Sequence, residues 1–295
     1  MNVLITGGTG FIGSTLCSRL LEKKHTIIVL SRHPNAIKEP VTAINDLKQL
    51  KKEAAFDIVI NLAGEPIADK RWSTLQKQRI LSSRIDTTQK LIAYFKTVKQ
   101  KPKLFISGSA IGYYGISETN EAVDETVSGD SSFASQLCQQ WEATASQAQA
   151  LGIRTCLLRT GIVLGKGGGA LNKMLIPFKL GLGGRIGQGT QWMPWIHIDD
   201  LVGIILLCID NDSLSGAING TSPNPVTNQV FTKTLGKVLK RPAILPLPVL
   251  VVKLLMGQMG EELLLAGKKV LPIKVLDAGY QFKYNELEKA LVNIV

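Results

Sequence analysis

Closely spaced glycines near the N-terminus are the strongest indication of the chemistry of this chain. They follow the apolar run 3–5, which is typical of a short buried strand, and precede an amphipathic helical pattern that begins at Phe11 and Ile12. Such glycines permit a tight turn, let the backbone approach a pyrophosphate, and let the helix pack closely against the strand. The glycines are Gly7, Gly8, Gly10 and Gly13. A structural turn is the alternative, but the flanking strand and helix favour a dinucleotide whose phosphates bind the free N–H groups of the helix.

The residues after the next predicted strand, 26–30, indicate which dinucleotide binds. NAD-binding folds usually carry an acid here, which accepts hydrogen bonds from the adenosine ribose. This chain has Ser31 and Arg32 instead, a hydroxyl donor and a guanidinium that suit a 2′-phosphate. A solvated surface arginine is the alternative. We therefore predict that the cofactor is NADP(H).

Strand-like apolar runs alternate with helical patterns in the first half of the chain. The later strands are predicted at residues 41–44, 57–62, 104–107 and 155–158, and the longer helices at 73–98 and 130–150. This alternation predicts an α/β fold, a doubly wound parallel sheet of the Rossmann type with helices on both faces. Beyond residue 165 the chain is rich in glycine and then mostly helical. We predict an NADP(H)-binding domain over 1–165 and a smaller C-terminal substrate lobe over 166–295, with some segments returning to the first domain.

Composition limits the classes of function. The 295 residues and 45% apolar content fit an ordinary globular protein. The formal charge of +11 is spread over the chain without a dense basic run, which favours an anionic cofactor or substrate over nucleic acid. The longest apolar run, residues 244–256, is interrupted by prolines and a lysine and falls short of the roughly 18 residues of a membrane span. No secretory signal is evident, so we expect a cytoplasmic protein without a membrane partner.

The histidines and cysteines lack the spacing of metal ligands. The chain has three histidines, and its four cysteines form no Cys-x-x-Cys pair, so we predict no metal site. His197 alternates with apolar residues on a strand-like segment that leads to an N-cap aspartate, which favours a packing role over acid–base chemistry.

Several ordered motifs resemble the extended short-chain dehydrogenase/reductase superfamily, and more narrowly its atypical subfamily labelled nucleoside-diphosphate-sugar epimerases. The motifs occupy residues 61–67, 83–84, 107–115, 141–142, 158–165, 194–201, 224–228, 267–272 and 279–282. The resemblance implies NADP(H) binding, with no established substrate. The candidate cofactor-binding residues are Gly7, Gly10, Phe11, Ile12, Gly13, Ser31, Arg32, Leu62, Ala63, Gly64, Glu65 and Arg84.

The usual acid–base residues of this superfamily are missing. Its members use a tyrosinate in Tyr-x-x-x-Lys, where the lysine lowers the pKa of a phenol that exchanges a proton during hydride transfer. The predicted helix at 132–147 contains neither tyrosine nor lysine. Ser109 matches the superfamily's upstream serine, and Tyr113 and Tyr114 follow it in the same loop. We predict Ser109 and Tyr113 as candidate catalytic residues, with hinge packing as the alternative for the tyrosines. Asp86 is expected to have a structural role, capping the helix and pairing with Arg84, with a proton relay as the alternative.

Two interpretations of the function stay open. One is an NADP(H)-dependent oxidoreductase or epimerase that acts on a small molecule bearing a carbonyl or a negative charge. The other is a non-catalytic NADP(H)-binding regulator or sensor, which the missing tyrosine and lysine favour. A slow NADPH-dependent carbonyl reduction is the expected activity, because a tyrosine without a nearby lysine donates a proton more readily than it accepts one at neutral pH.

Overall fold

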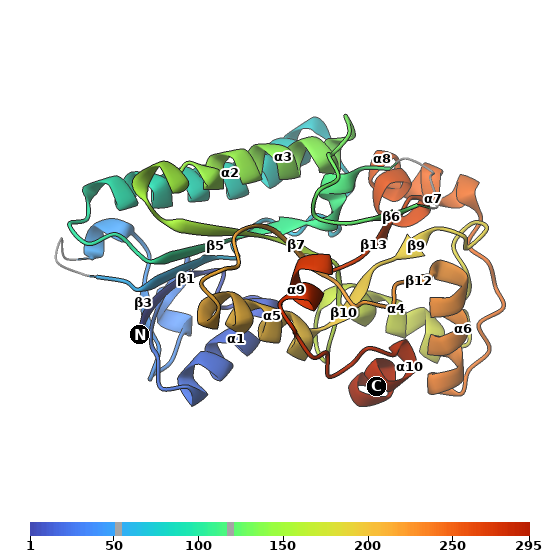
Figure 1. Cartoon of the computed structure of the whole chain (residues 1–295). Helices are drawn as coiled ribbons and strands as arrows, with labels where there is room; N and C mark the ends of the chain where they lie inside the picture. Colours follow the sequence, from blue (N-terminus) through green and yellow to red (C-terminus); the bar gives the residue numbers. More distant parts are fainter. Residues whose placement is uncertain (51–54, 117–120) are drawn as a thin grey trace.

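Seven parallel strands form the central sheet of the computed structural model, which describes residues 1–50, 55–116 and 121–295. Their order is β11-β7-β5-β4-β1-β2-β3, so the direction of the winding reverses between β1 and β4 (Figure 1). Ligands of such sheets bind at the carboxyl ends of the strands at this reversal. The strands are β1 (Asn2–Thr6), β2 (Thr26–Leu30), β3 (Thr42–Ile44), β4 (Ile58–Asn61), β5 (Leu104–Ala110), β7 (Arg154–Thr160) and β11 (Gly216–Gly220).

Helices cover both faces of the sheet. Alternate residues of the strands, such as Ile5 and Ile60, pack against α1 (Phe11–Glu22) and α5 (Ile198–Asp210). The intervening residues, such as Val59, pack against α2 (Thr74–Thr97) and α3 (Phe133–Ser146) on the opposite face (Figure 1). Burial on both faces explains why the strands are almost uniformly apolar. The predicted fold class is confirmed.

The C-terminal lobe lies beyond the carboxyl ends of the central strands (Figure 1). A second apolar core joins α4, α6 and α10 there. Three short two-stranded sheets pair β6 with β13, β8 with β10, and β9 with β12. The helices are α4 (Gly169–Lys179), α6 (Asn228–Leu239), α7 (Val249–Met256), α8 (Gln258–Gly260), α9 (Ile273–Asp277) and α10 (Leu287–Ile294). The strands are β6 (Ala122–Val123), β8 (Ile162–Leu164), β9 (Trp192–Met193), β10 (Trp195–His197), β12 (Val226–Thr227) and β13 (Lys269–Val270).

Short turns complete the chain. The 3-10 turns are Pro34–Ala36, Leu47–Gln49, Ile111–Tyr114 and Gln149–Leu151, and Glu261–Leu265 forms a π-helical turn. Both α5 and β11 follow residue 165 in the sequence, yet they lie in the layers of the central sheet. The division into domains at residue 165 stays a prediction. Within the described ranges, no helix is long and apolar enough to cross a membrane.

Buried polar contacts attach the C-terminal segment to α5. The carboxylate of Asp200 accepts hydrogen bonds from the backbone N–H groups of Lys283 and Tyr284 at 2.7 and 2.9 Å. His197 is the N-cap of α5, and its Nδ1 accepts the backbone N–H of Asp199 at 3.1 Å. Burial lowers the pKa of His197, which favours the neutral ring that this cap requires. The histidine is therefore structural, but the expectation of an aspartate cap was wrong, because Asp199 lies in the first turn.

Candidate cofactor site

The glycine loop between β1 and α1 contains two kinds of glycine. Some are needed for folding, and one leaves space for a ligand. Gly7 has a φ of +71°, which favours glycine. A Cβ on Gly13 would lie 2.1 Å from the carbonyl oxygen of Gly7, so this glycine lets the helix pack against the loop. A Cβ on Gly8 would lie 2.7 Å from Val29, and Gly8 needs no positive φ. Gly10 is different, because among the described residues beyond its chain neighbours its Cβ would meet only the Gly7 oxygen, at 3.2 Å.

The N-terminus of α1 is free to bind an anion. Gly10 is the N-cap, and within the described residues no side chain caps the helix and no acid lies in its first turn. The first N–H groups of a helix lack intrahelical partners and carry a partial positive charge. This end of α1 can therefore accept a phosphate.

A second glycine-rich turn covers the start of α1. The ring of Phe11 packs against the loop between β8 and α4, where a Cβ on Gly165 or Gly168 would lie 2.8 or 2.5 Å from ring atoms. Gly169 has a φ of +68° and also contacts this ring. Larger side chains in the loop would displace Phe11. The loop thereby brings the beginning of the C-terminal lobe to the predicted phosphate site.

Buried polar side chains fix the loop after β4. Thr6 Oγ1 donates to Asn61 Oδ1 at 2.6 Å and accepts the backbone N–H of Ala63 at 3.1 Å. Asn61 Nδ2 in turn donates to Thr88 Oγ1 at 2.9 Å. Trp141 Nε1 donates to the same oxygen at 3.1 Å. This chain of hydrogen bonds connects β1, β4, α2 and α3, and it orients residues 62–64 toward the glycine loop.

Arg84 supports the backbone of this loop. Its guanidinium donates to the carbonyl oxygens of Glu65 and Ile80, both at 3.0 Å. A Cβ on Gly64 would lie 2.9 Å from the guanidinium carbon, so glycine leaves room for Arg84. Burial lowers the pKa of Arg84. The expected pairing of Arg84 with Asp86 was wrong, because Arg84 bonds to backbone oxygens whereas Asp86 is exposed.

Ser31 and Arg32 border a shallow groove beside the cofactor loop. Ser31 Oγ accepts the backbone N–H of His33 at 3.1 Å, so its own proton is free to donate to a ligand. Arg32 is exposed, and three further charged side chains of the groove come from α2. The groove is lined by Arg32, Glu65, Arg79, Ser82, Ser83, Asp86, Thr87 and Lys90. Its cations can receive a phosphate at the position where the sequence predicts the 2′-phosphate.

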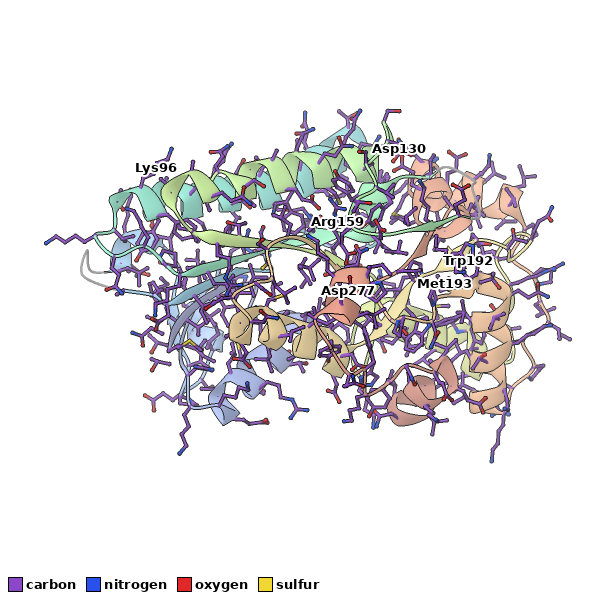
Figure 2. The ribbon with its side chains drawn as sticks, viewed as in Figure 1. Lys96, Asp130, Arg159, Trp192, Met193 and Asp277 are labelled. Atoms are coloured by element: carbon purple, nitrogen blue, oxygen red, sulfur yellow. The ribbon has the colours of Figure 1, made fainter. Side chains whose placement is uncertain are left out.

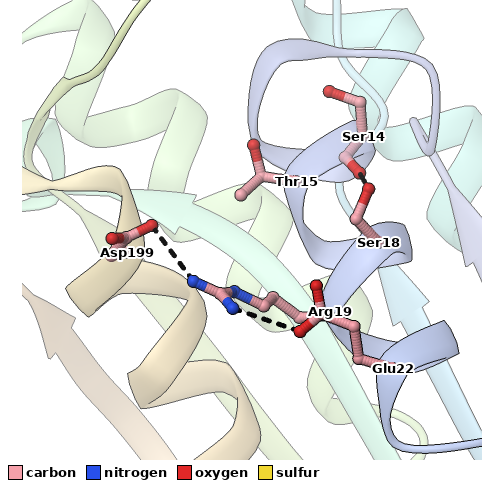
Figure 3. Close-up of a pocket in the computed structure, with 6 residues that line it drawn as sticks. All are labelled: Ser14, Thr15, Ser18, Arg19, Glu22 and Asp199. Atoms are coloured by element: carbon pink, nitrogen blue, oxygen red, sulfur yellow. Dashed lines mark hydrogen bonds and ion pairs between the residues drawn. The ribbon is translucent and has the colours of Figure 1, made fainter. Parts of the chain in front are cut away.

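Another groove lies between α1 and the start of α5 (Figure 3). Arg19 crosses it to pair with Glu22 at 3.1 Å and with Asp199 at 3.7 Å. The remaining lining residues are Ser14, Thr15 and Ser18. Since its cation is already paired with carboxylates, this groove is a poor anion site.

A buried ion pair occupies the region where the superfamily has its acid–base residues. Glu142 of α3 accepts from Arg159 of β7 through two bonds, Nε at 2.8 Å and Nη2 at 2.9 Å. Arg159 lies inside the molecule (Figure 2). Burial alone would lower the pKa of Arg159, but the hydrogen bonds and charge of Glu142 raise it above its usual range. Ser109 Oγ donates to Glu142 Oε1 at 2.6 Å, so the hydroxyl proton of this predicted catalytic residue is directed at the ion pair.

The neighbouring tyrosines have different surroundings. Tyr114 is fully buried, its hydroxyl donates to Asn219 Oδ1 at 2.7 Å, and it accepts from Arg159 at 3.0 Å. Burial raises the pKa of Tyr114 to about 12. Tyr113 is half-buried, and the guanidinium carbon of Arg159 lies 3.4 Å from its ring centroid. The hydroxyl of Tyr113 makes no hydrogen bond with the described residues, which leaves it available to a ligand.

Sequence reasoning missed the partners that hold these residues. It gave no role to Thr6, Thr88 or the Glu142–Arg159 pair. The available signal was a charged side chain in the predicted helix at 132–147 and another at the end of the predicted strand at 155–158, since charged groups are rarely buried unless paired. Metal binding has no support in the described residues, which contain no cluster of three or more potential ligands. Cys138 is buried, and burial raises the pKa of its thiol to about 11.

The glycine loop, the parallel sheet and the C-terminal lobe define the class of protein. The chain belongs to the NAD dependent epimerase/dehydratase family, whose model matches residues 3–219, and residues 247–294 match a domain of unknown function, DUF1731. The resemblance predicted from the motifs is thus confirmed.

Individual relatives resemble the chain along its whole length. The human epimerase family protein SDR39U1 is 39% identical, with all of both chains covered. A crystal structure of human SDR39U1 (isoform 2) with NADPH has a TM-score of 0.89 at 38% identity, covering 100% of this chain and 99% of that one. The chloroplastic SDR39U1 homologue of Arabidopsis thaliana is 40% identical over 99% of this chain and 86% of its own.

Proposed function

We propose that this protein binds NADP(H) and catalyses a slow reduction of a carbonyl group on a small molecule. The observation that carries the proposal is the combination of the free N-terminus of α1 with Ser31 and Arg32 at the end of β2. The first feature suits the pyrophosphate and the second suits a 2′-phosphate. The NADPH in the crystal structure of human SDR39U1 supports the same assignment.

The residues around the glycine loop fit this cofactor. Gly10 leaves the space above the helix open, and Thr6 and Arg84 hold the loop at residues 62–65 that we expect beside the cofactor. Phe11 and Ile12 begin the helix that would bind the phosphates. We assign these residues to binding and positioning.

Replacing Arg32 by Ala should weaken NADPH binding and hardly change NADH binding. The lost charge-assisted hydrogen bonds are worth roughly 1.5–3 kcal/mol, or about 10- to 150-fold in affinity. Calorimetry with both cofactors measures the difference. Lys96→Ala removes an exposed cation from the far end of α2 and should leave both affinities unchanged. Equal losses for NADPH and NADH would show that Arg32 does not recognise the 2′-phosphate.

Tyr113 is the best candidate for the proton donor. Reduction of a carbonyl needs a hydride at carbon, which NADPH supplies when bound, and a proton at oxygen. The hydroxyl of Ser109 donates to Glu142 and that of Tyr114 to Asn219, whereas the hydroxyl of Tyr113 is not engaged by any described residue. Arg159, stacked on the ring, fixes the orientation of the phenol. Tyr113 can then give its proton to the carbonyl oxygen and recover it from water.

Tyr113→Phe should lower the rate of carbonyl reduction by about 10²-fold and leave NADPH affinity unchanged. Single-turnover oxidation of bound NADPH with a panel of aldehydes, ketones and keto acids measures this rate. Tyr114→Phe is the matched control, which should lower stability and leave the rate within a few-fold, because its hydroxyl is used in the interior. Tight NADPH binding without oxidation by any compound would favour a sensor instead.

The net charge of the chain bears on the class of substrate. The positive charge of the chain favours an anionic small molecule. UDP-glucuronic acid 4-epimerase from Bacillus cereus, solved with UDP-glucuronic acid and NAD, has a TM-score of 0.79 over 99% of this chain and 96% of its own, and at 20% identity it shares the fold alone.

We place the protein in the cytoplasm, and detection of the tagged protein by cell fractionation tests this placement.

A further inference from the structure

The C-terminal lobe exposes an unusual number of apolar side chains. Residues 244–250 are all exposed, and among them Ile244 and Leu250 have 79% and 67% of their surface accessible. Leu254 and Leu255 of α7 follow at 66% and 70%. Single exposed apolar side chains are common in proteins, but a continuous exposed apolar segment indicates an interaction surface.

A second segment extends this surface. Leu180 and Leu182, just after α4, are 69% and 57% exposed. Backbone hydrogen bonds join the two segments. The N–H groups of Leu245 and Leu247 donate to the carbonyl oxygens of Gly183 and Arg185 at 3.2 and 2.8 Å, respectively. We call the exposed apolar side chains of residues 180–182 and 244–255 the apolar stripe.

All charged residues within the two sequence segments that carry the apolar stripe are basic. Residues 170–198 contain three lysines or arginines and residues 213–260 contain five, and neither segment contains an aspartate or a glutamate. Those next to the apolar stripe form a basic rim, which consists of Lys179, Arg185, Lys240, Arg241 and Lys253. Within the described residues only Lys253 of this rim has an ion-pair partner, Glu261 at 3.1 Å.

The combination of exposed apolar side chains and a basic rim indicates which kind of partner fits this surface. A second copy of the chain in a two-fold dimer would bring two identical basic rims together, which is repulsive. Nucleic acid would pair with the rim but would leave the leucines exposed. A bilayer with anionic lipids satisfies both, because leucines enter the acyl boundary while lysines and arginines contact the phosphates.

We propose that the apolar stripe and its basic rim dock the protein on the surface of an anionic membrane. The protein then lies on the bilayer without crossing it. The sequence prediction of no membrane partner considered only a spanning helix. It could not detect this surface, because the rim is assembled from separated segments that meet only in the fold.

Sedimentation of the full chain with lipid vesicles tests the proposal. Binding is expected to vesicles of phosphatidylcholine and phosphatidylserine and not to phosphatidylcholine alone. Lys240→Gln/Arg241→Gln should weaken binding about 25-fold, because each cation near an anionic surface contributes roughly fivefold. Leu250→Gln/Leu254→Gln should weaken it by at least about tenfold. All four side chains are exposed, so these variants should keep the thermal stability and NADPH affinity of the parent protein.

The matched controls change side chains elsewhere. Lys96→Gln/Lys99→Gln removes two exposed cations at the C-terminal end of α2 and just after it, and Leu75→Gln/Val292→Gln removes two exposed apolar side chains outside the stripe. Both should bind vesicles like the parent protein. Equal binding by all variants, binding to neutral vesicles alone, or no vesicle binding would overturn the proposal. So would a dimer in solution that dissociates when Leu250 and Leu254 are changed.

Discussion

Gly10→Val is expected to abolish NADPH binding while the protein still folds. Gly10 has φ −76° and ψ 174°, an extended conformation that valine adopts readily. Apart from the chain neighbours of Gly10, the Gly7 oxygen at 3.2 Å is the one atom of the described residues within 4 Å of the Cβ position, so the side chain would extend into the space above the start of α1. There it would exclude the pyrophosphate from the N–H groups. The loss of several charge-assisted hydrogen bonds should weaken binding by more than about a thousandfold.

Calorimetric titration with NADPH, together with thermal unfolding of the free protein, checks this result. Ser18→Val is the matched control, since it introduces the same side chain at an exposed position of the same helix. It should bind NADPH normally. Gly13→Ala, by contrast, should impair folding, because its Cβ would lie 2.1 Å from the Gly7 oxygen. Normal binding by Gly10→Val would mean that the phosphates do not lie at this helix.

Local sequence patterns were sufficient to predict the central sheet and the glycine loop. An apolar run followed by Gly7 and then by an amphipathic segment specifies strand, turn and helix within a few residues. The same local logic located β2 at residues 26–30 and both long helices, α2 and α3, within a few residues of their ends. Alternation of strands and helices then limited the sheet to a parallel arrangement.

Contacts between distant residues could not be predicted in this way. The pattern around Phe11 does not indicate that the turn at residues 165–169 covers its ring. Arg84 was expected beside the cofactor loop, but its acceptors are backbone oxygens, which carry no sequence signal. Tyr113 and Tyr114 are adjacent in the sequence, and only the fold buries one hydroxyl and leaves the other without a protein partner.

The ion pair between Glu142 and Arg159 is the clearest example of a contact that the sequence does not predict. The single charge of α3, Glu142, and the two arginines of β7 were visible in the sequence, but which of them pair depends on how the helix packs against the strand. In the structure Glu142 also accepts from Ser109, so one carboxylate satisfies two buried donors. The energetic consequence of this arrangement can be measured.

Glu142→Leu should lower the free energy of unfolding by about 3–5 kcal/mol, because the buried guanidinium of Arg159 would keep its charge and lose its partner. Chemical denaturation measures the change. Replacing both members, as Glu142→Leu/Arg159→Met, should recover much of the loss, since no unpaired charge remains in the interior. Glu22→Leu is the surface control. It breaks the exposed pair with Arg19 and should cost less than about 1 kcal/mol.

The double variant also separates stability from chemistry. It removes the guanidinium that stacks on Tyr113, so the phenol would lose its fixed orientation even where the fold is restored. We expect normal NADPH affinity and a reduction rate as low as that of Tyr113→Phe. A double variant as unstable as Glu142→Leu would contradict the role of the unpaired charge. A stable double variant with the parental rate would show that Arg159 does not position Tyr113.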